Sequence, residues 1–141
     1  MKEHWIVPCN PKQLDIKKHV LKTDLIAFKK VRPLTTGDDV YIYICGKQDQ
    51  QIKYKGVVVD DNCNEEEMKN HLYAVSVNEY GKSPYKYVLI KLSAEFPDGT
   101  VTIENLKDCG FGQVQCQART SRILLEFLKE KENLLTKLNH Y

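Results

Sequence analysis

The chain has 141 residues, of which 42% are hydrophobic and 28% charged, and its formal net charge is +2. This composition is typical of a folded globular protein and argues against a disordered chain. No apolar run approaches the roughly 20 residues that a membrane-spanning helix needs, and the opening residues turn polar too soon for a secretory signal. We therefore expect one soluble domain over residues 1–141, with no membrane contact.

The cysteines argue against a disulfide framework and against a zinc site. They number five, which is odd, and they form no CxxC motif and no close Cys/His pairing. We expect reduced, mostly packed thiols in a cytoplasmic protein. We predict neither a metal nor another cofactor.

Positive charge is concentrated near the N-terminus. Seven basic residues lie between Lys12 and Arg32, against two acidic ones, and five acidic residues follow between Asp60 and Glu67. Two interpretations stay open. The basic stretch is either a solvated, lysine-coated surface, or a field that orients the molecule on a polyanion such as nucleic acid.

The first third of the chain predicts a strand, a helix and a second strand. Residues 4–7 are rich in strand formers, and Asn10 can cap a helix whose first position is Pro11. A modest apolar stripe continues this helix to Leu21 and leaves Lys17, Lys18 and Lys22 facing outward. A short apolar segment at 25–28 follows.

A β-hairpin is expected next. A turn at 36–39 leads into 40–45, which is apolar throughout, so both faces of this strand should be covered. Residues 51–59 supply the second strand of the hairpin.

The remainder predicts more strands and two helices. Strands are expected at 72–77, 85–92 and 113–118, a short helix at 102–109, and a longer helix from about Ser121 to Leu138. Some six strands with these helices describe an α+β fold, a small, mostly antiparallel β-barrel with peripheral helices and a C-terminal helix.

Motifs of catalysis are missing from the sequence. The histidines are scattered, and there is no P-loop, GxSxG or dinucleotide fingerprint. Asp60 and Asp61 are more simply a solvated strand end than a metal site. We predict no catalytic residue, although groups from distant segments can still converge into an active site.

Several short strings resemble EVE domains when they are taken in order. His4 to Pro11, with its aromatic strand and Asn-Pro, is similar to the opening of that family. Thr36 to Tyr43 resembles its Gly-Asp turn and Ile-Tyr strand, and Tyr54 to Val59 its aromatic-x-Gly strand. The resemblance extends to Arg119 and the terminal helix. It implies a PUA-like barrel, in the superfamily that also holds YTH and ASCH domains.

The resemblance further implies a reader of modified bases. YTH domains hold a methylated adenine of RNA in an aromatic cage, and EVE-like domains are associated with modified cytosines in DNA, often in modification-dependent restriction systems. Phe28 stands where those families usually place a tryptophan, and Trp5 is expected to be a core residue. The implied base-binding residues are Pro8, Cys9, Asn10, Phe28, Tyr80 and Tyr85. The resemblance also implies Arg119 as a phosphate contact. The basic stretch would add sequence-independent phosphate contacts from Lys17, Lys18, Lys29, Lys30 and Arg32.

The expected partner is therefore nucleic acid carrying a methylated or hydroxymethylated base, bound by a monomer without enzymatic activity of its own. Two alternatives stay open. One is an ASCH-like enzyme that acts on a nucleoside or RNA with Lys29 or Lys30 and with Asp60 or Glu79. The other is an interaction module that docks a nuclease or ATPase through its lysine face and terminal helix.

Overall fold

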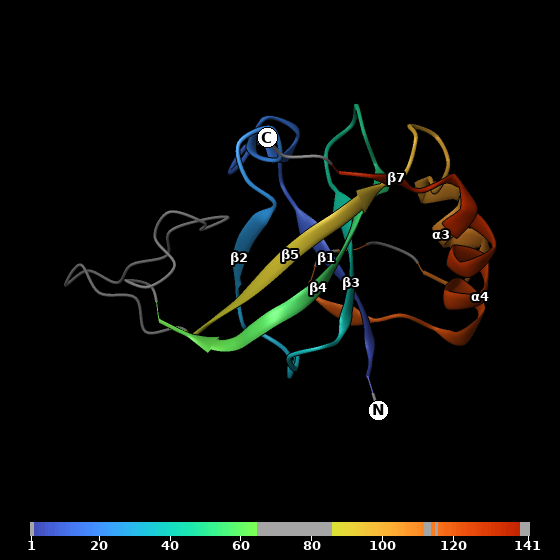
Figure 1. Cartoon of the computed structure of the whole chain (residues 1–141). Helices are drawn as coiled ribbons and strands as arrows, with labels where there is room; N and C mark the ends of the chain where they lie inside the picture. Colours follow the sequence, from blue (N-terminus) through green and yellow to red (C-terminus); the bar gives the residue numbers. More distant parts are fainter. Residues whose placement is uncertain (1, 65–85, 112–113, 115, 139–141) are drawn as a thin grey trace.

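The structure is a computed structural model that describes residues 2–64, 86–111, 114 and 116–138 (Figure 1). Within these ranges seven strands form one sheet, in the order β2-β5-β4-β3-β1-β6, with β7 also paired to β5. The pair β1–β3 is parallel and the other pairs are antiparallel. The strands are β1 (His4–Cys9), β2 (Leu25–Lys29), β3 (Asp39–Ile44), β4 (Gln51–Cys63), β5 (Tyr87–Glu95), β6 (Ala118–Arg119) and β7 (Thr136–Lys137).

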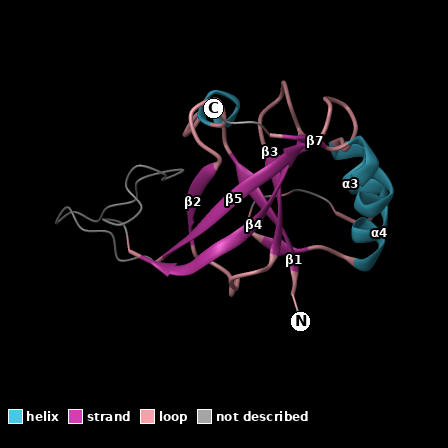
Figure 2. Ribbon diagram, viewed as in Figure 1, coloured by secondary structure: helices cyan, strands magenta, loops and turns pink. Residues whose placement is uncertain are grey.

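The helices lie around the sheet. Helices α3 (Ile103–Asp108) and α4 (Arg122–Lys131) lie together on one side, and the short α1 (Ile16–His19) lies apart from them (Figure 2). A 3-10 turn, η1 (Glu132–Leu134), follows α4. This mixed arrangement confirms the predicted α+β fold class.

The sheet curls until its two ends meet. Strands β2 and β6 stand at opposite ends of the strand order, yet the Nε2 of Gln117, just before β6, donates a hydrogen bond to the carbonyl of Lys29 in β2 at 2.7 Å. The contact links the ends of the sheet and gives it the form of a barrel.

Alternation along the central strands builds two hydrophobic layers. Trp5 and Val7 of β1 pack into the barrel interior, whereas Ile6 packs with α3 and α4 on the opposite face. In β3, Ile42 faces inward and Tyr41 faces the helices. The prediction that both faces of the 40–45 strand are covered is confirmed, because side chains of a strand alternate between two faces that are both packed here.

The predicted first helix is wrong in its bounds. Asn10 caps a turn, accepting a hydrogen bond from Lys12 N at 3.0 Å, and α1 begins only after Asp15, whose side chain accepts from Lys18 N. Two local side-chain caps divide the segment, since each Asn or Asp can satisfy backbone N–H groups close to it. Leu21, assigned to the apolar stripe, is 81% exposed.

The predicted C-terminal helix ends early. Helix α4 stops at Lys131, and Leu135 is extended. Thr136 and Lys137 then pair with Glu95 and Ala94 of β5, beyond the stretch of β5 that β2 covers. Backbone pairing along an open strand edge outweighs the helical pattern of the sequence. The strand expected at 72–77 lies outside the described residues, and the one expected at 113–118 is seen there only as β6.

Candidate nucleic-acid interface

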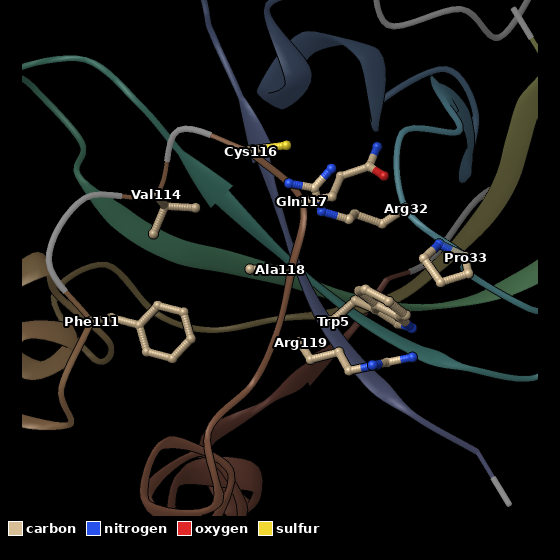
Figure 3. A pocket seen from close by; sticks show the side chains of 9 residues that line it. All are labelled: Trp5, Arg32, Pro33, Phe111, Val114, Cys116, Gln117, Ala118 and Arg119. Atoms are coloured by element: carbon tan, nitrogen blue, oxygen red, sulfur yellow. The ribbon is translucent and has the colours of Figure 1, made fainter.

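A pocket of about 500 Å³ opens where three distant segments meet (Figure 3). Strand β1, the loop after β2, and the chain between α3 and β6 each supply part of its wall. A pocket of this size lies in the ordinary range for small ligands and exceeds the bulk of a nucleobase. Its lining residues are Trp5, Arg32, Pro33, Phe111, Val114, Cys116, Gln117, Ala118 and Arg119.

Arg119 lies over the ring of Trp5. The two residues are cross-strand partners in the β1–β6 pairing, and the guanidinium carbon is 5.0 Å from the ring centroid. A cation over an indole at this distance is a cation–π contact. The side chain of Arg119 remains 59% exposed, with the carboxylate of Glu3 at 3.8 Å, so its charge is accessible from solution.

Asp38 binds the N–H group of the Trp5 indole. Its carboxylate accepts hydrogen bonds from Trp5 Nε1 at 2.9 Å, Thr35 N at 2.9 Å and Glu3 N at 3.0 Å. Burial by itself would raise the pKa of Asp38, but these hydrogen bonds outweigh it and the pKa lies below its usual value. The Gly-Asp turn of the sequence thus ties the indole to the loop that follows Arg32.

Arg32 brings a second positive charge to the pocket. It is exposed, and its Nη1 donates to the carbonyl of the neighbouring Val31 at 3.0 Å. In the part of the chain that the structure describes, it forms no ion pair with a carboxylate. Two guanidinium groups therefore border one pocket, an arrangement suited to an anionic ligand.

Gln117 forms a buried part of the pocket wall. The residue is only 6% exposed, and its Nε2 donates a hydrogen bond to the carbonyl of Lys29. Its Oε1 is buried and has no hydrogen-bond partner among the residues described. Cys116, the residue before it, is exposed and lies at the same pocket.

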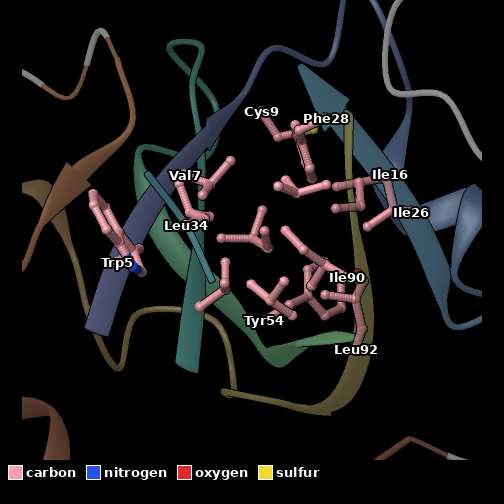
Figure 4. Close-up of a cluster of buried hydrophobic side chains, with 14 of the residues drawn as sticks. Trp5, Val7, Cys9, Ile16, Ile26, Phe28, Leu34, Tyr54, Ile90 and Leu92 are labelled. Carbon is pink, nitrogen blue, oxygen red and sulfur yellow. The ribbon is translucent and has the colours of Figure 1, made fainter. Parts of the chain in front are cut away.

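Two of the implied base-binding residues lie in the barrel interior. Cys9 is fully buried and Phe28 is 3% exposed, and both belong to the inward-facing cluster (Figure 4). Burial raises the pKa of the Cys9 thiol to about 12. Figure 4 shows these two side chains together and Trp5 apart from them. A base would touch them only after they left the core, because packed interiors leave no room for a ring.

The other implied base-binding residues are not gathered at this pocket. Pro8 is half-buried in β1, and Asn10 caps its turn. Tyr80 and Tyr85 lie outside the described residues. The aromatic cage built from these positions stays a prediction.

The implied phosphate contacts are divided between two places. Arg32 and Arg119 meet at the pocket, and Lys29 and Lys30 stand just before Arg32, at the end of β2. Lys17 lies elsewhere: its Nζ is 2.6 Å from Asp49, and it lines a second pocket of about 530 Å³ with the buried Lys53 and the C-terminal Leu138. Lys18 is on α1 as well, 83% exposed. The basic stretch of the sequence is thus not one continuous binding face.

Trp5 and Gln117 are site residues that the sequence did not reveal as such. Trp5 is 2% exposed and belongs to the core as expected, yet it also forms the pocket wall. For Gln117 a signal existed: it lies two residues before Arg119, and in an extended segment such side chains leave the backbone on the same side.

The part of the chain described offers little support for other kinds of site. No group of three or more His, Cys, Asp or Glu side chains there is arranged to hold a metal ion, and the five cysteines are free. None of the helices described could cross a bilayer. The enzymatic alternative names Asp60 and Glu79. Asp60 lies at an exposed strand end, where it accepts a hydrogen bond from Asn62 N at 3.1 Å, and Glu79 lies outside the described residues.

Comparison with known proteins identifies the fold through solved structures. No family model matches the chain, and no curated protein is similar to it in sequence. Human THYN1 protein in complex with 5-methylcytosine-containing DNA is similar over 93% of this chain and 98% of that one, with a TM-score of 0.65 and 10% identity. The chain has a PUA-like fold. This confirms the fold that the resemblance to EVE domains implies.

Two further structures show the same fold. A mutant form of an ASCH protein from Zymomonas mobilis matches 92% of this chain and 96% of its own, at 10% identity and a TM-score of 0.64. A hypothetical protein from Leishmania major matches 94% and 96%, at 18% identity and a TM-score of 0.61. At such identities the likeness extends to the fold, and site residues must be argued from this chain itself.

Proposed function

We propose that the chain is a nucleic-acid-binding module that takes one modified base into the pocket beside Trp5, with Arg32 and Arg119 in contact with the phosphates around it. The observation that carries this proposal is the pair of accessible guanidinium groups on a pocket walled by an indole. A PUA-like neighbour whose structure contains 5-methylcytosine DNA supports it.

The chemistry of the pocket suits a base that has left its stack. Extrusion from a duplex costs a few kcal/mol, and less from a single strand. Aromatic and guanidinium faces return roughly 1–3 kcal/mol per stacked base, and here Phe111 and Arg119 offer such faces, with Trp5 packed beneath Arg119. A methyl group buried against them adds about 0.8 kcal/mol. Preference for the modified base is therefore modest, and most of the affinity comes from phosphate contacts.

Titration with oligonucleotides that differ only in one methylated cytosine tests the proposal. The wild-type chain should bind single strands more tightly than duplexes, prefer the methylated strand, and lose affinity as salt rises. Arg32→Ala and Arg119→Ala should each weaken binding and reduce the slope of log affinity against log salt by about 0.7 per lost contact to a single strand.

Arg122→Ala is the matched control. Its side chain is 93% exposed and pairs only with Glu126 of the same helix, at 3.4 Å, among the described residues. It removes the same charge from another surface and should leave both affinity and salt slope unchanged. A folded wild-type chain that binds no oligonucleotide, or equal losses in all three variants, would contradict the proposal.

A further inference from the structure

The amide oxygen of Gln117 is a buried acceptor without a donor. The residue is 6% exposed and lines the pocket beside Trp5. Its Oε1 has no hydrogen-bond partner within the described residues. Folded proteins leave few buried polar atoms unpaired, and each one calls for an explanation, such as a role in binding a ligand.

The orientation of this amide follows from its neighbour. Oxygen and nitrogen of a glutamine are assigned from the hydrogen-bond network. Here the group 2.7 Å from the amide is the carbonyl of Lys29, which can only accept. The nitrogen must face it, because the reverse orientation would place two acceptor oxygens against each other. Oε1 is therefore the acceptor of this amide that is left without a partner within the described residues.

The charged groups of the pocket wall are hydrogen-bond donors. Arg32 and Arg119 carry guanidinium groups, which donate and never accept. A complementary ligand therefore brings an N–H for Gln117 and acceptor atoms for the arginines. Cytosine and adenine, like guanine, have an exocyclic amino group next to a ring nitrogen that accepts. Thymine and uracil place a carbonyl oxygen where the amino group of cytosine would be, so in the same orientation this oxygen would face Oε1, and only their ring N3–H could donate.

Resting on the function proposed above, we infer that Gln117 is a specificity-determining residue that selects bases with an exocyclic amino group, cytosine and its methylated form among them, over thymine and uracil. A purely structural role, closing the barrel through Lys29, needs only Nε2 and gives Oε1 nothing to do. Selection of an amino group uses both ends of the amide.

The test compares 5-methylcytosine with thymine at one position of an otherwise identical single strand. Both bases carry the methyl group, so the comparison isolates the amino group. The wild-type chain should bind the 5-methylcytosine strand about tenfold more tightly, as expected for one buried polar atom left unpaired in the weaker complex. A cytosine and uracil pair of strands should give the same ratio without the methyl group.

Gln117→Met keeps the length of the side chain and removes both polar atoms. It should bring the ratio between the two strands close to one. Gln48→Met, on an exposed loop, is the control and should keep the wild-type ratio. Thermal denaturation of each variant separates effects on folding from effects on selection, because a structural role lowers the melting temperature without changing the ratio.

The outcomes distinguish the two proposals. Equal binding of both strands by the wild-type chain overturns the role of Gln117 and leaves nucleic-acid binding intact. An unchanged ratio in a folded Gln117→Met variant overturns it as well. If that variant does not fold, the wild-type ratio still decides. Absence of binding to any strand overturns the proposed function, and this inference with it.

Discussion

The indole N–H of Trp5 donates to the carboxylate of Asp38 at 2.9 Å, across 33 positions of the chain. The same carboxylate accepts from Thr35 N, close to Arg32 and Pro33. Two walls of the pocket are therefore held by one buried side chain, which is 3% exposed. Asp38 contacts no ligand in this arrangement and acts by positioning the residues that do.

Asp38→Asn should destabilise the protein and weaken oligonucleotide binding. Asparagine keeps one acceptor and turns an N–H toward groups that also donate, so the loss should be about 1.5–3 kcal/mol, the contribution of hydrogen bonds to a charged group. Chemical denaturation with Trp5 fluorescence as the signal measures it. Asp108→Asn, at the exposed end of α3, should change neither property. Equal stability of Asp38→Asn and wild type would show that the network contributes little.

The free energy of unfolding should fall in acid, and protonation of Asp38 should cause part of this fall. The pKa of Asp38 in the folded protein lies below its ordinary value of 3.8, so its contribution is complete above pH 3.8 and is lost as the pH falls through the lower, folded-state pKa. Asp98, whose pKa Lys53 lowers, acts in the same window. Asp38→Asn should therefore flatten part, not all, of the decline in unfolding free energy below pH 4. An unaltered decline would contradict this assignment.

Cys116 should report occupancy of the pocket. It is the exposed cysteine, whereas burial, with smaller effects of Cys45 and Asp15, raises the pKa of Cys9 to about 12. Because the thiolate is the species that reacts, iodoacetamide at neutral pH should label Cys116 and spare Cys9 in the folded chain, as mass spectrometry of peptides would show. Saturating oligonucleotide should slow the labelling of Cys116. Equal labelling rates with and without oligonucleotide would argue against binding at this pocket.

Gly56→Ala should destabilise the barrel. A Cβ at this position would lie 2.5 Å from the carbonyl oxygen of Lys91 and 3.1 Å from the Cα of Leu92, both backbone atoms of β5. Strands β4 and β5 would have to separate, at a cost of about 1–3 kcal/mol. Val59→Ala, in the same strand but 39% exposed, is the comparison, and it should cost less in a urea titration. The close approach of β4 and β5 thus explains why the aromatic-x-Gly string has a glycine at this position.

Local patterns predicted much of the fold. The 40–45 and 51–59 strands pair as expected, and Thr102 caps α3 through a capping box that includes Asn105. The bounds of the first and last helices were wrong because other contacts decide them. Leu135 leaves the helical pattern so that the next two residues can pair with β5, and no signal near Leu135 encodes the position of that edge.

The site was predicted only in part. Arg32 and Arg119 were identified by charge and by resemblance, and the structure brings them to one pocket. Their meeting depends on the pairing of β1 with β6, which joins residues 5 and 119 and leaves no periodic trace in the sequence. The resemblance implies Phe28 as a base-binding residue, and its burial places it in the core of this structure.

Strand β1 lies between β3 and β6, and this order has a consequence for biosynthesis. Trp5 leaves the ribosome more than a hundred residues before the strand that carries Arg119. Pairings between such distant segments form slowly, since a long loop must close first. A nascent or C-terminally truncated chain would thus display an unshielded indole in place of a finished binding surface.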